Sequence, residues 1–190
     1  EDAGYRVREA GTAAEAIAAV DAELPALILL DMVLPDSSGL DVVRKLRDQP
    51  ETREVPVVAL TGQVPTEFVG NDAFQETDTI GVTRSITKHS FLVRDVKDLS
   101  TVIKEAYHIA RTGRPGPVVV DLPKDVQMAS CAFHYPERVA IRGYAVPGKG
   151  DEEKIELAAE MIAASERPLL YVGGGTIIAD AAENLTELAR

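Results

Sequence analysis

The chain has 190 residues, 45% of them hydrophobic and 27% charged, and its 31 acidic and 20 basic residues give a net charge of -11. Surfaces that bind nucleic acid or anionic membranes need clustered Lys and Arg, so this balance excludes both classes of partner. The longest apolar run, residues 26–30, is too short to span a bilayer, and the single cysteine, Cys131, excludes an internal disulfide framework. We expect a cytoplasmic protein.

The first elements are a short strand at residues 5–8 and a helix that follows a capping box. In this box the Thr12 hydroxyl and the Glu15 carboxylate satisfy two free amides of the new helix. Residues 26–31 are apolar without alternation, which is typical of a strand covered on both faces. The first third of the chain therefore predicts alternating strands and helices.

A second helix and a second buried strand come next. Residues 40–47 have helical spacing, with Leu40, Val43 and Leu46 expected to face inward, and residues 55–60 predict the strand.

The middle of the chain continues the alternation. Residues 86–93 and 118–122 are expected to be strands on either side of a helix at 98–111, which ends at Gly113. Strands that alternate with helices predict an α/β fold, with a mainly parallel sheet between two helical layers.

A linker at residues 134–150 is rich in proline and glycine. After it we expect a partial second Rossmann-like βα unit, made of a helix capped by Asp151, a strand at 168–172, a glycine turn and a final helix near 179–188. The inward face of the first of these helices is predicted to consist of Ile155, Ala158, Ala159 and Ile162.

Two polar residues end the first buried strands, namely Asp31 and Thr61. The carboxyl ends of parallel strands form the crevice where ligands usually bind, so this position favours function. An aspartate at a strand end is, taken alone, more often a helix cap or a turn former.

The segments 26–39, 40–46 and 55–61 together resemble the receiver domain of two-component response regulators over about residues 1–62. The resemblance implies that Asp31 is a phosphoacceptor, that Thr61 is the switch hydroxyl and that a histidine kinase is the partner. The acidic pair that holds magnesium in this family is expected before Glu1, and its final-strand lysine is unmatched. We therefore expect phosphorylation of Asp31 to be weak or lost.

Residues 58–190 resemble a different family, the large subunit of acetolactate synthase, also called acetohydroxyacid synthase. Five segments carry this resemblance in order, namely 62–65, 70–76, 83–89, 113–117 and 120–125. The family condenses pyruvate with a second 2-keto acid and uses thiamine diphosphate, magnesium and FAD.

The resemblance to acetolactate synthase implies a role for nine residues. Gln75, Lys124 and Lys88 would belong to the catalytic site or its entrance, Phe74 and Pro65 to the substrate channel, and Arg114, Gly173, Gly174 and Gly175 to an FAD site. A neutral amide can donate to a developing oxyanion, an ammonium favours a carboxylate, and a glycine turn admits a pyrophosphate. Each residue also has a plainer interpretation as a solvated side chain, a helix-end charge or a tight turn.

The catalytic glutamate and the diphosphate motif of that family are unmatched here. A chain that cannot ionise or anchor thiamine diphosphate cannot make acetolactate, so we expect no cofactor and no metal ion to be bound by the isolated chain. The segment 143–149 has the spacing of a phosphate-binding loop, but Gly150 replaces its Ser or Thr.

The sequence therefore predicts a chimera with a flavodoxin-like, three-layer α/β/α sheet. The expected parts are a receiver-like segment at 1–62, the end of a pyrimidine-binding domain at 63–133 merged with it into one sheet, the linker at 134–150 and the start of a middle domain at 151–190. Three functions stay open: a synthase fragment that is inactive alone, a signalling receiver, and a scaffold without activity. Partners could be the remaining enzyme domains or a second copy of the chain.

Overall fold

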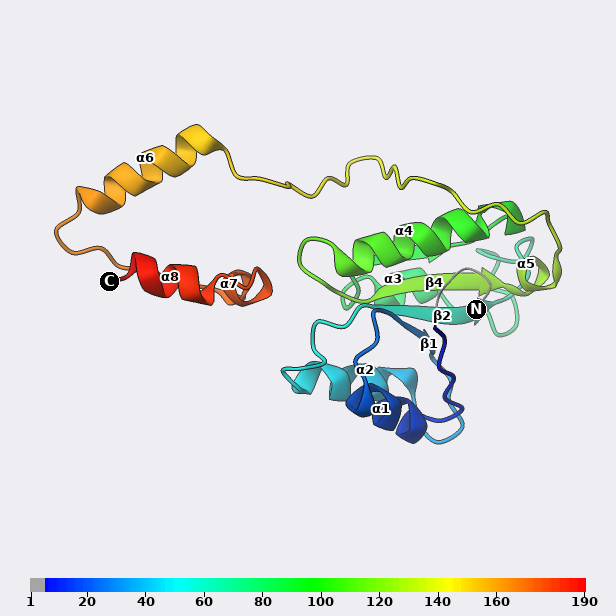
Figure 1. Cartoon of the computed structure of the whole chain (residues 1–190). Helices are drawn as coiled ribbons and strands as arrows, with labels where there is room; N and C mark the ends of the chain where they lie inside the picture. Colours follow the sequence, from blue (N-terminus) through cyan, green and yellow to red (C-terminus); the bar gives the residue numbers. More distant parts are fainter. Residues whose placement is uncertain (1–5) are drawn as a thin grey trace. The chain divides into compact units, whose positions relative to one another are not determined.

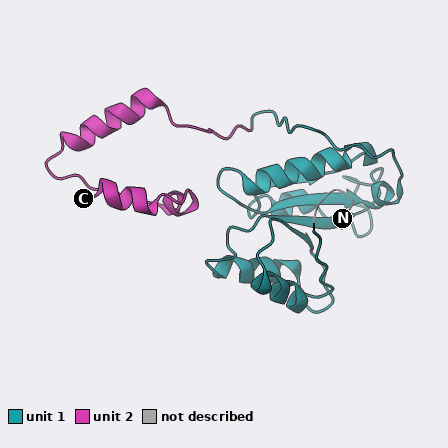
Figure 2. Ribbon diagram, in the orientation of Figure 1, with its two compact units in different colours: residues 1–143 teal, residues 144–190 magenta. Residues whose placement is uncertain are grey.

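The computed structural model describes residues 6–190. It divides the chain into two compact units, unit 1 (Glu1–Gly143) and unit 2 (Tyr144–Arg190) (Figure 2). The boundary falls inside the segment 134–150, where the sequence predicts a linker. Of the strand expected at residues 5–8, Tyr5 lies outside the described residues, and residues 6–8 are not a strand.

Unit 1 is built around one parallel sheet of four strands. These are β1 (Ile28–Asp31), β2 (Val57–Gln63), β3 (His89–Leu92) and β4 (Val118–Pro123), in the spatial order β1-β2-β4-β3. All three pairings are parallel, which confirms the predicted α/β fold. Strand β2 crosses residue 62, so the position where the two resemblances meet lies within a central strand.

Helices cover both faces of this sheet (Figure 1). α1 (Ala13–Ala22) and α2 (Gly39–Asp48) lie on one face, and α4 (Leu99–Arg111), which follows the 3-10 turn η1 (Val96–Asp98), lies on the other and contacts β2, β3 and β4. The short α3 (Thr79–Thr83) contacts β3 and β4, and α5 (Lys124–Met128) follows β4. The three-layer arrangement agrees with the prediction.

Hydrogen bonds at the start of α1 fix both the helix and the loop that follows β1. The Thr12 hydroxyl accepts from the Glu15 amide at 3.1 Å, and the Glu15 carboxylate accepts from the Gly11 amide rather than the Thr12 amide of the usual box. The Asp36 carboxylate, from the loop after β1, accepts from the Ala13 amide at 2.8 Å. The bonds from the Ala13 and Ala14 amides lower the pKa of Asp36, with the Ala13 amide as the largest cause.

The inward face of α2 differs from the prediction. Val42 and Leu46 are buried, Val43 is only partly buried and Leu40 is exposed. Positions four apart stack on one helix face, and here the pair 42 and 46 reaches the core. One cluster of buried side chains packs the α1–α2 layer against β1 and β2: Ala13, Val20, Leu30, Val42, Leu46 and Val57.

Unit 2 has three helices, α6 (Glu152–Ala163), α7 (Gly174–Ile178) and α8 (Ala182–Leu188). The strand predicted at residues 168–172 does not form, and none of the residues in unit 2 is buried, including the face of α6 that was expected to be inward. A strand needs a neighbour for its backbone groups, and unit 2 has no other strand. Among the described residues, no helix is long and apolar enough to cross a membrane.

Candidate functional site

Polar side chains gather at the carboxyl edge of the sheet. A hollow of about 470 Å³ opens there, between the end of β2, the end of β4 and the β2–α3 loop (residues 64–78). Its lining includes Gln63 and Asp121 from the strands, Glu76 and Asp78 from the loop, and the apolar Leu92. Four carboxylates line this hollow, counting Asp72, so an anionic ligand is disfavoured inside it.

Asp121 is the most buried ionisable group of this edge, with 1% of its surface exposed. Its carboxylate accepts from the Thr61 hydroxyl at 2.6 Å and from the Gln63 amide at 3.1 Å. Burial raises the pKa of Asp121, because the charged form loses its hydration, while hydrogen bonds from Thr61, Gln63 and Thr79 act in the opposite direction.

The β2–α3 loop is closed by its own side chains and by one link to β2. The Glu76 carboxylate accepts from the amides of Gly70 and Ala73, and these bonds, Gly70 first, lower its pKa. The Gln63 amide nitrogen donates to the Thr77 carbonyl at 2.7 Å. The loop is thereby attached to the same glutamine that contacts Asp121.

The predicted substrate residues Phe74 and Gln75 lie in this loop, but neither lines the hollow. Phe74 is 90% exposed and Gln75 is also exposed. Gln75 has a φ of 67° and Asp72 a φ of 54°, a backbone region that residues with a side chain rarely adopt. Strained loop backbone of this kind persists only when its surroundings hold it.

Pro65 and Lys124 lie at the same edge of the sheet. Gln63 pairs with Pro123 in the β2–β4 register, so Pro65 and Lys124 each follow shortly after a paired strand end. The Asp125 carboxylate then accepts from both the amide, at 2.9 Å, and the hydroxyl of Thr66. Those bonds lower the pKa of Asp125, the hydroxyl being the largest cause. Lys124 is exposed beside this contact.

Lys88 and Arg114 lie at the opposite edge of the sheet. Lys88 immediately precedes β3, and its ammonium donates to the carbonyls of Ile109, at 2.6 Å, and Thr112 at the end of α4. A lysine in this position stabilises the carboxyl end of a helix. Arg114 precedes β4 and is exposed. The structure therefore does not bring Lys88 or Arg114 together with Gln75 and Lys124.

The glycines predicted to contact FAD are in unit 2. Gly173 precedes the five-residue α7, and Gly174 and Gly175 begin it. A phosphate-binding turn needs a strand that presents the glycines to the ligand, and the segment before them is not a strand. The described residues therefore do not fit FAD.

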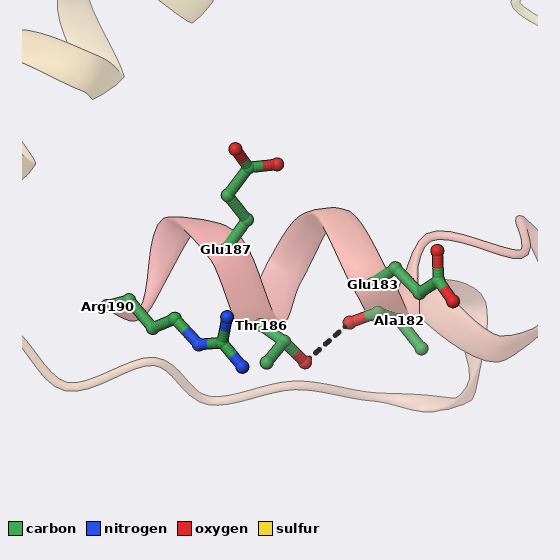
Figure 3. Close-up of a pocket in the computed structure, with 5 residues that line it drawn as sticks. All are labelled: Ala182, Glu183, Thr186, Glu187 and Arg190. Atoms are coloured by element: carbon green, nitrogen blue, oxygen red, sulfur yellow. Dashed lines mark hydrogen bonds between the residues drawn. The ribbon is translucent and has the colours of Figure 1, made fainter.

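A second hollow lies in unit 2 and is lined by residues of α8 and its ends. The Glu187 side chain there points away from Thr186 and Arg190 (Figure 3).

The side chains of Asp31 and Thr61, on the neighbouring strands β1 and β2, do not point to the same face of the sheet. Asp31 pairs with Leu60, and Thr61 pairs with Asp121. Successive residues of a strand point to opposite faces, so the register places Asp31 and Thr61 on different faces. The Asp31 carboxylate accepts from the Val33 amide at 3.0 Å, and the side chain is exposed. No group of three or more His, Cys, Asp or Glu able to hold a metal ion occurs within residues 6–190.

The sequence predictions did not include Asp121, Gln63, Thr66 or Asp125. One signal could have identified Asp121, because it is a charged residue at the end of a valine run that predicts a fully buried strand. Buried carboxylates need hydrogen-bond donors, and the donors Thr61 and Gln63 lie at the end of β2, which pairs with β4.

Comparison with known proteins gives two different relatives. Residues 1–90 match the family model of the response regulator receiver domain. The acetolactate synthase of Mycobacterium bovis is 51% identical over 135 residues, which are 71% of this chain and 22% of that protein. The large subunit of acetolactate synthase from Corynebacterium glutamicum is 47% identical over 135 residues, with the same two coverages.

A crystal structure assigned as a response regulator of Chloroflexus aurantiacus has 32% identity and a TM-score of 0.32, covering 35% of this chain and 54% of that one. The chain spans about a fifth of the length of the curated relatives named above. The receiver match extends beyond residue 62, the limit expected from the sequence. The two matched lengths together exceed 190 residues, so the matches overlap.

Proposed function

Since the chain is a composite of a segment similar to response regulator receiver domains and a segment similar to the acetolactate synthase large subunit, we propose that its carboxyl edge contributes to a 2-keto-acid site. The role is to bind and orient the keto acid. In enzymes of the synthase family, thiamine diphosphate supplies the carbanion chemistry. Catalysis is expected only together with the remaining parts of such an enzyme.

One observation supports this proposal most. Pro65 and Lys124 are held at one edge by the Thr66–Asp125 contact, and the loop that carries Phe74 and Gln75 leaves the same edge. In this arrangement Lys124 attracts the carboxylate of the keto acid, Gln75 donates to its carbonyl oxygen, and Phe74 and Pro65 contact its alkyl end. The carboxylate of the ligand stays outside the acidic hollow, because Asp121 and its neighbours repel it.

Titration of the isotope-labelled chain with pyruvate tests the proposal. We expect NMR shifts at Gln75 and around Lys124, and a loss of about tenfold in affinity in Lys124→Met, equivalent to about 1.4 kcal/mol for the lost ionic contact. Lys97→Met is the matched control, since Lys97 is an exposed lysine of η1. Unchanged affinity in Lys124→Met, or equal losses in both variants, would refute the proposed site.

Turnover is a separate measurement. With pyruvate, thiamine diphosphate, magnesium and FAD, the chain alone is expected to form no acetolactate. Formation of acetolactate would contradict the proposal that this chain only binds and orients the substrate.

Phosphorylation of Asp31 is the second candidate function, favoured by the receiver match and by the exposure of Asp31 at a strand end. The Thr61 hydroxyl already donates to Asp121, and receiver chemistry would need it at the phosphoryl group. We therefore expect no stable adduct after incubation with acetyl phosphate and magnesium. A stoichiometric phosphate adduct in the intact mass, absent in Asp31→Asn, would favour the receiver function instead.

A further inference from the structure

We propose that Asp121 is a positioning residue for the β2–α3 loop, and that it acts through Gln63. The chain of contacts runs from the buried carboxylate of Asp121 to the Gln63 side chain and then to the Thr77 carbonyl. Its effect on the keto acid rests on the function proposed above, because that function uses Gln75 of the same loop. Its effect on the loop can be measured without any ligand.

The first step of the relay is the fixed position of Asp121. Its carboxylate is buried in strand β4, and Thr61 and Gln63 from the neighbouring strand β2 both donate to it. Burying a carboxylate costs more folding free energy when it has no hydrogen-bond donors than when it keeps them. Asp121 therefore holds the Gln63 amide at the edge of the sheet.

The second step is the complete use of the Gln63 amide. Its nitrogen donates both to Asp121, at 3.1 Å, and to the Thr77 carbonyl, at 2.7 Å, and its oxygen accepts from the Val64 amide at 2.9 Å. An amide has two donor hydrogens and one acceptor oxygen, so all three are engaged. A rotation of this side chain would break at least two of these bonds.

The third step is the bond from Gln63 to the β2–α3 loop, whose backbone conformation needs contacts that hold it. Asp72 and Gln75 both have positive φ, and residues with a side chain persist in such conformations only where other contacts hold them. The Glu76 carboxylate closes the loop upon itself through Gly70 and Ala73. The Gln63–Thr77 bond connects this closed loop to the sheet, and so to Asp121.

Hydrogen exchange of the full chain tests the proposal with two substitutions at one position. In Asp121→Leu, Gln63 loses its buried acceptor, and we expect the amides of Gly70 and Ala73 to exchange about tenfold faster, or about 1.4 kcal/mol easier opening. In Asp121→Asn, the side-chain oxygen can accept from Gln63 while its NH₂ donates to the Thr61 hydroxyl. We therefore expect exchange in the loop to stay within about twofold of the wild type.

A second pair of substitutions keeps the test decisive if Asp121→Leu does not fold. Gln63→Met removes the relay and leaves Asp121 in place, and it should accelerate loop exchange as Asp121→Leu does. Gln127→Met is the matched control, because the Gln127 amide donates to the Leu122 carbonyl at the same edge and has no bond to the loop. Loop exchange should be unchanged in this control.

Two outcomes would overturn the proposal. One is a loop that exchanges no faster than the wild-type loop in both Asp121→Leu and Gln63→Met, with the sheet amides of Val58 and Val120 as the internal reference. The other is an Asp121→Asn variant that releases the loop as much as Asp121→Leu does, because charge alone would then be responsible. If pyruvate fails to bind the wild type, the function proposed above fails, and the exchange result still decides the role of Asp121.

Discussion

Unit 1 and unit 2 each contain a helix that begins with a side-chain cap, yet all the buried residues of the described part of the chain lie in unit 1. Thr12 caps α1 in unit 1, and Asp151 caps α6 in unit 2 by accepting from the Lys154 amide at 3.2 Å. The two units differ because, within residues 6–190, only unit 1 contains a β-sheet for its helices to pack against. Local signals are sufficient to place a helix, whereas burial requires strands from distant parts of the sequence.

The largest expected effect compares one core residue with one apolar residue of unit 2. Leu46 is 1% exposed and Ile155 is 57% exposed. Leu46→Ala should lower the free energy of unfolding by about 2–5 kcal/mol, because it leaves a cavity. Ile155→Ala should change it by less than about 0.5 kcal/mol. Urea denaturation measures both, and similar losses would mean that unit 2 has a core of its own.

Glycines give a second comparison between the units. A Cβ at Gly39 would lie 2.5 Å from the Asp31 carbonyl oxygen, whereas one at Gly174 would meet no atom within 4 Å. We expect Gly39→Ala to destabilise unit 1 by about 1–3 kcal/mol through this overlap, and Gly174→Ala to be neutral or slightly favourable to α7. Thermal unfolding followed by circular dichroism checks both. A neutral Gly39→Ala would contradict the close approach between residues 31 and 39.

The buried charge of Asp121 predicts a pH dependence that is specific to unit 1. Its pKa is raised above the ordinary value of 3.8, so the folded state holds the proton more tightly than the unfolded state does. Wild-type stability relative to Asp121→Asn should fall as pH rises from 3.8 to the raised pKa, by about 1.4 kcal/mol per pH unit in that interval.

Subtracting the Asp121→Asn curve removes the contribution of Glu76, which lines the same hollow and has a lowered pKa. Unfolding by urea between pH 3.5 and 7, roughly the range in which carboxylates titrate in proteins, provides the two curves. Parallel curves would show that Asp121 is not buried as described.

The smallest expected effect concerns the strained loop. Gln75→Gly removes the penalty of a positive φ and should stabilise the chain by up to about 1 kcal/mol. The same substitution removes the amide that is proposed to contact the keto acid, so pyruvate affinity should fall. Gln75→Asn should stabilise the chain less, because asparagine tolerates this region better than glutamine but less well than glycine. A destabilising Gln75→Gly would contradict the assigned backbone conformation.

Much of unit 1 could be predicted from the sequence because its signals are local. Apolar runs predicted the four strands. The Thr12 cap predicted α1, and the helical spacing near Leu46 predicted α2. The segment 168–172 has the same apolar character, but pairing depends on a neighbour that its own sequence does not contain. The prediction of a strand there was wrong for this reason.

The site was less predictable because its geometry depends on register. Thr61 pairs with Asp121, so the Thr61 hydroxyl lies on the same face of the sheet as the Asp121 carboxylate. A shift of the register by one residue would pair Leu60 with Asp121 instead and would place the Thr61 hydroxyl on the opposite face from that carboxylate. The edge that Pro65 and Lys124 share follows from their position after parallel strands. That Lys88 lies at the other edge follows equally from its position before β3, although the resemblance had grouped it with Lys124.

Native-state hydrogen exchange in increasing urea tests the central claim most directly, namely that the receiver-like and synthase-like segments share one sheet through β2. The amides of Leu30 in β1 and Val120 in β4 report on the two sides. A single sheet predicts that both open with the same free energy and the same urea dependence, while the amides of α6 exchange much earlier. Opening of Leu30 at markedly lower free energy than Val120 would contradict the claim.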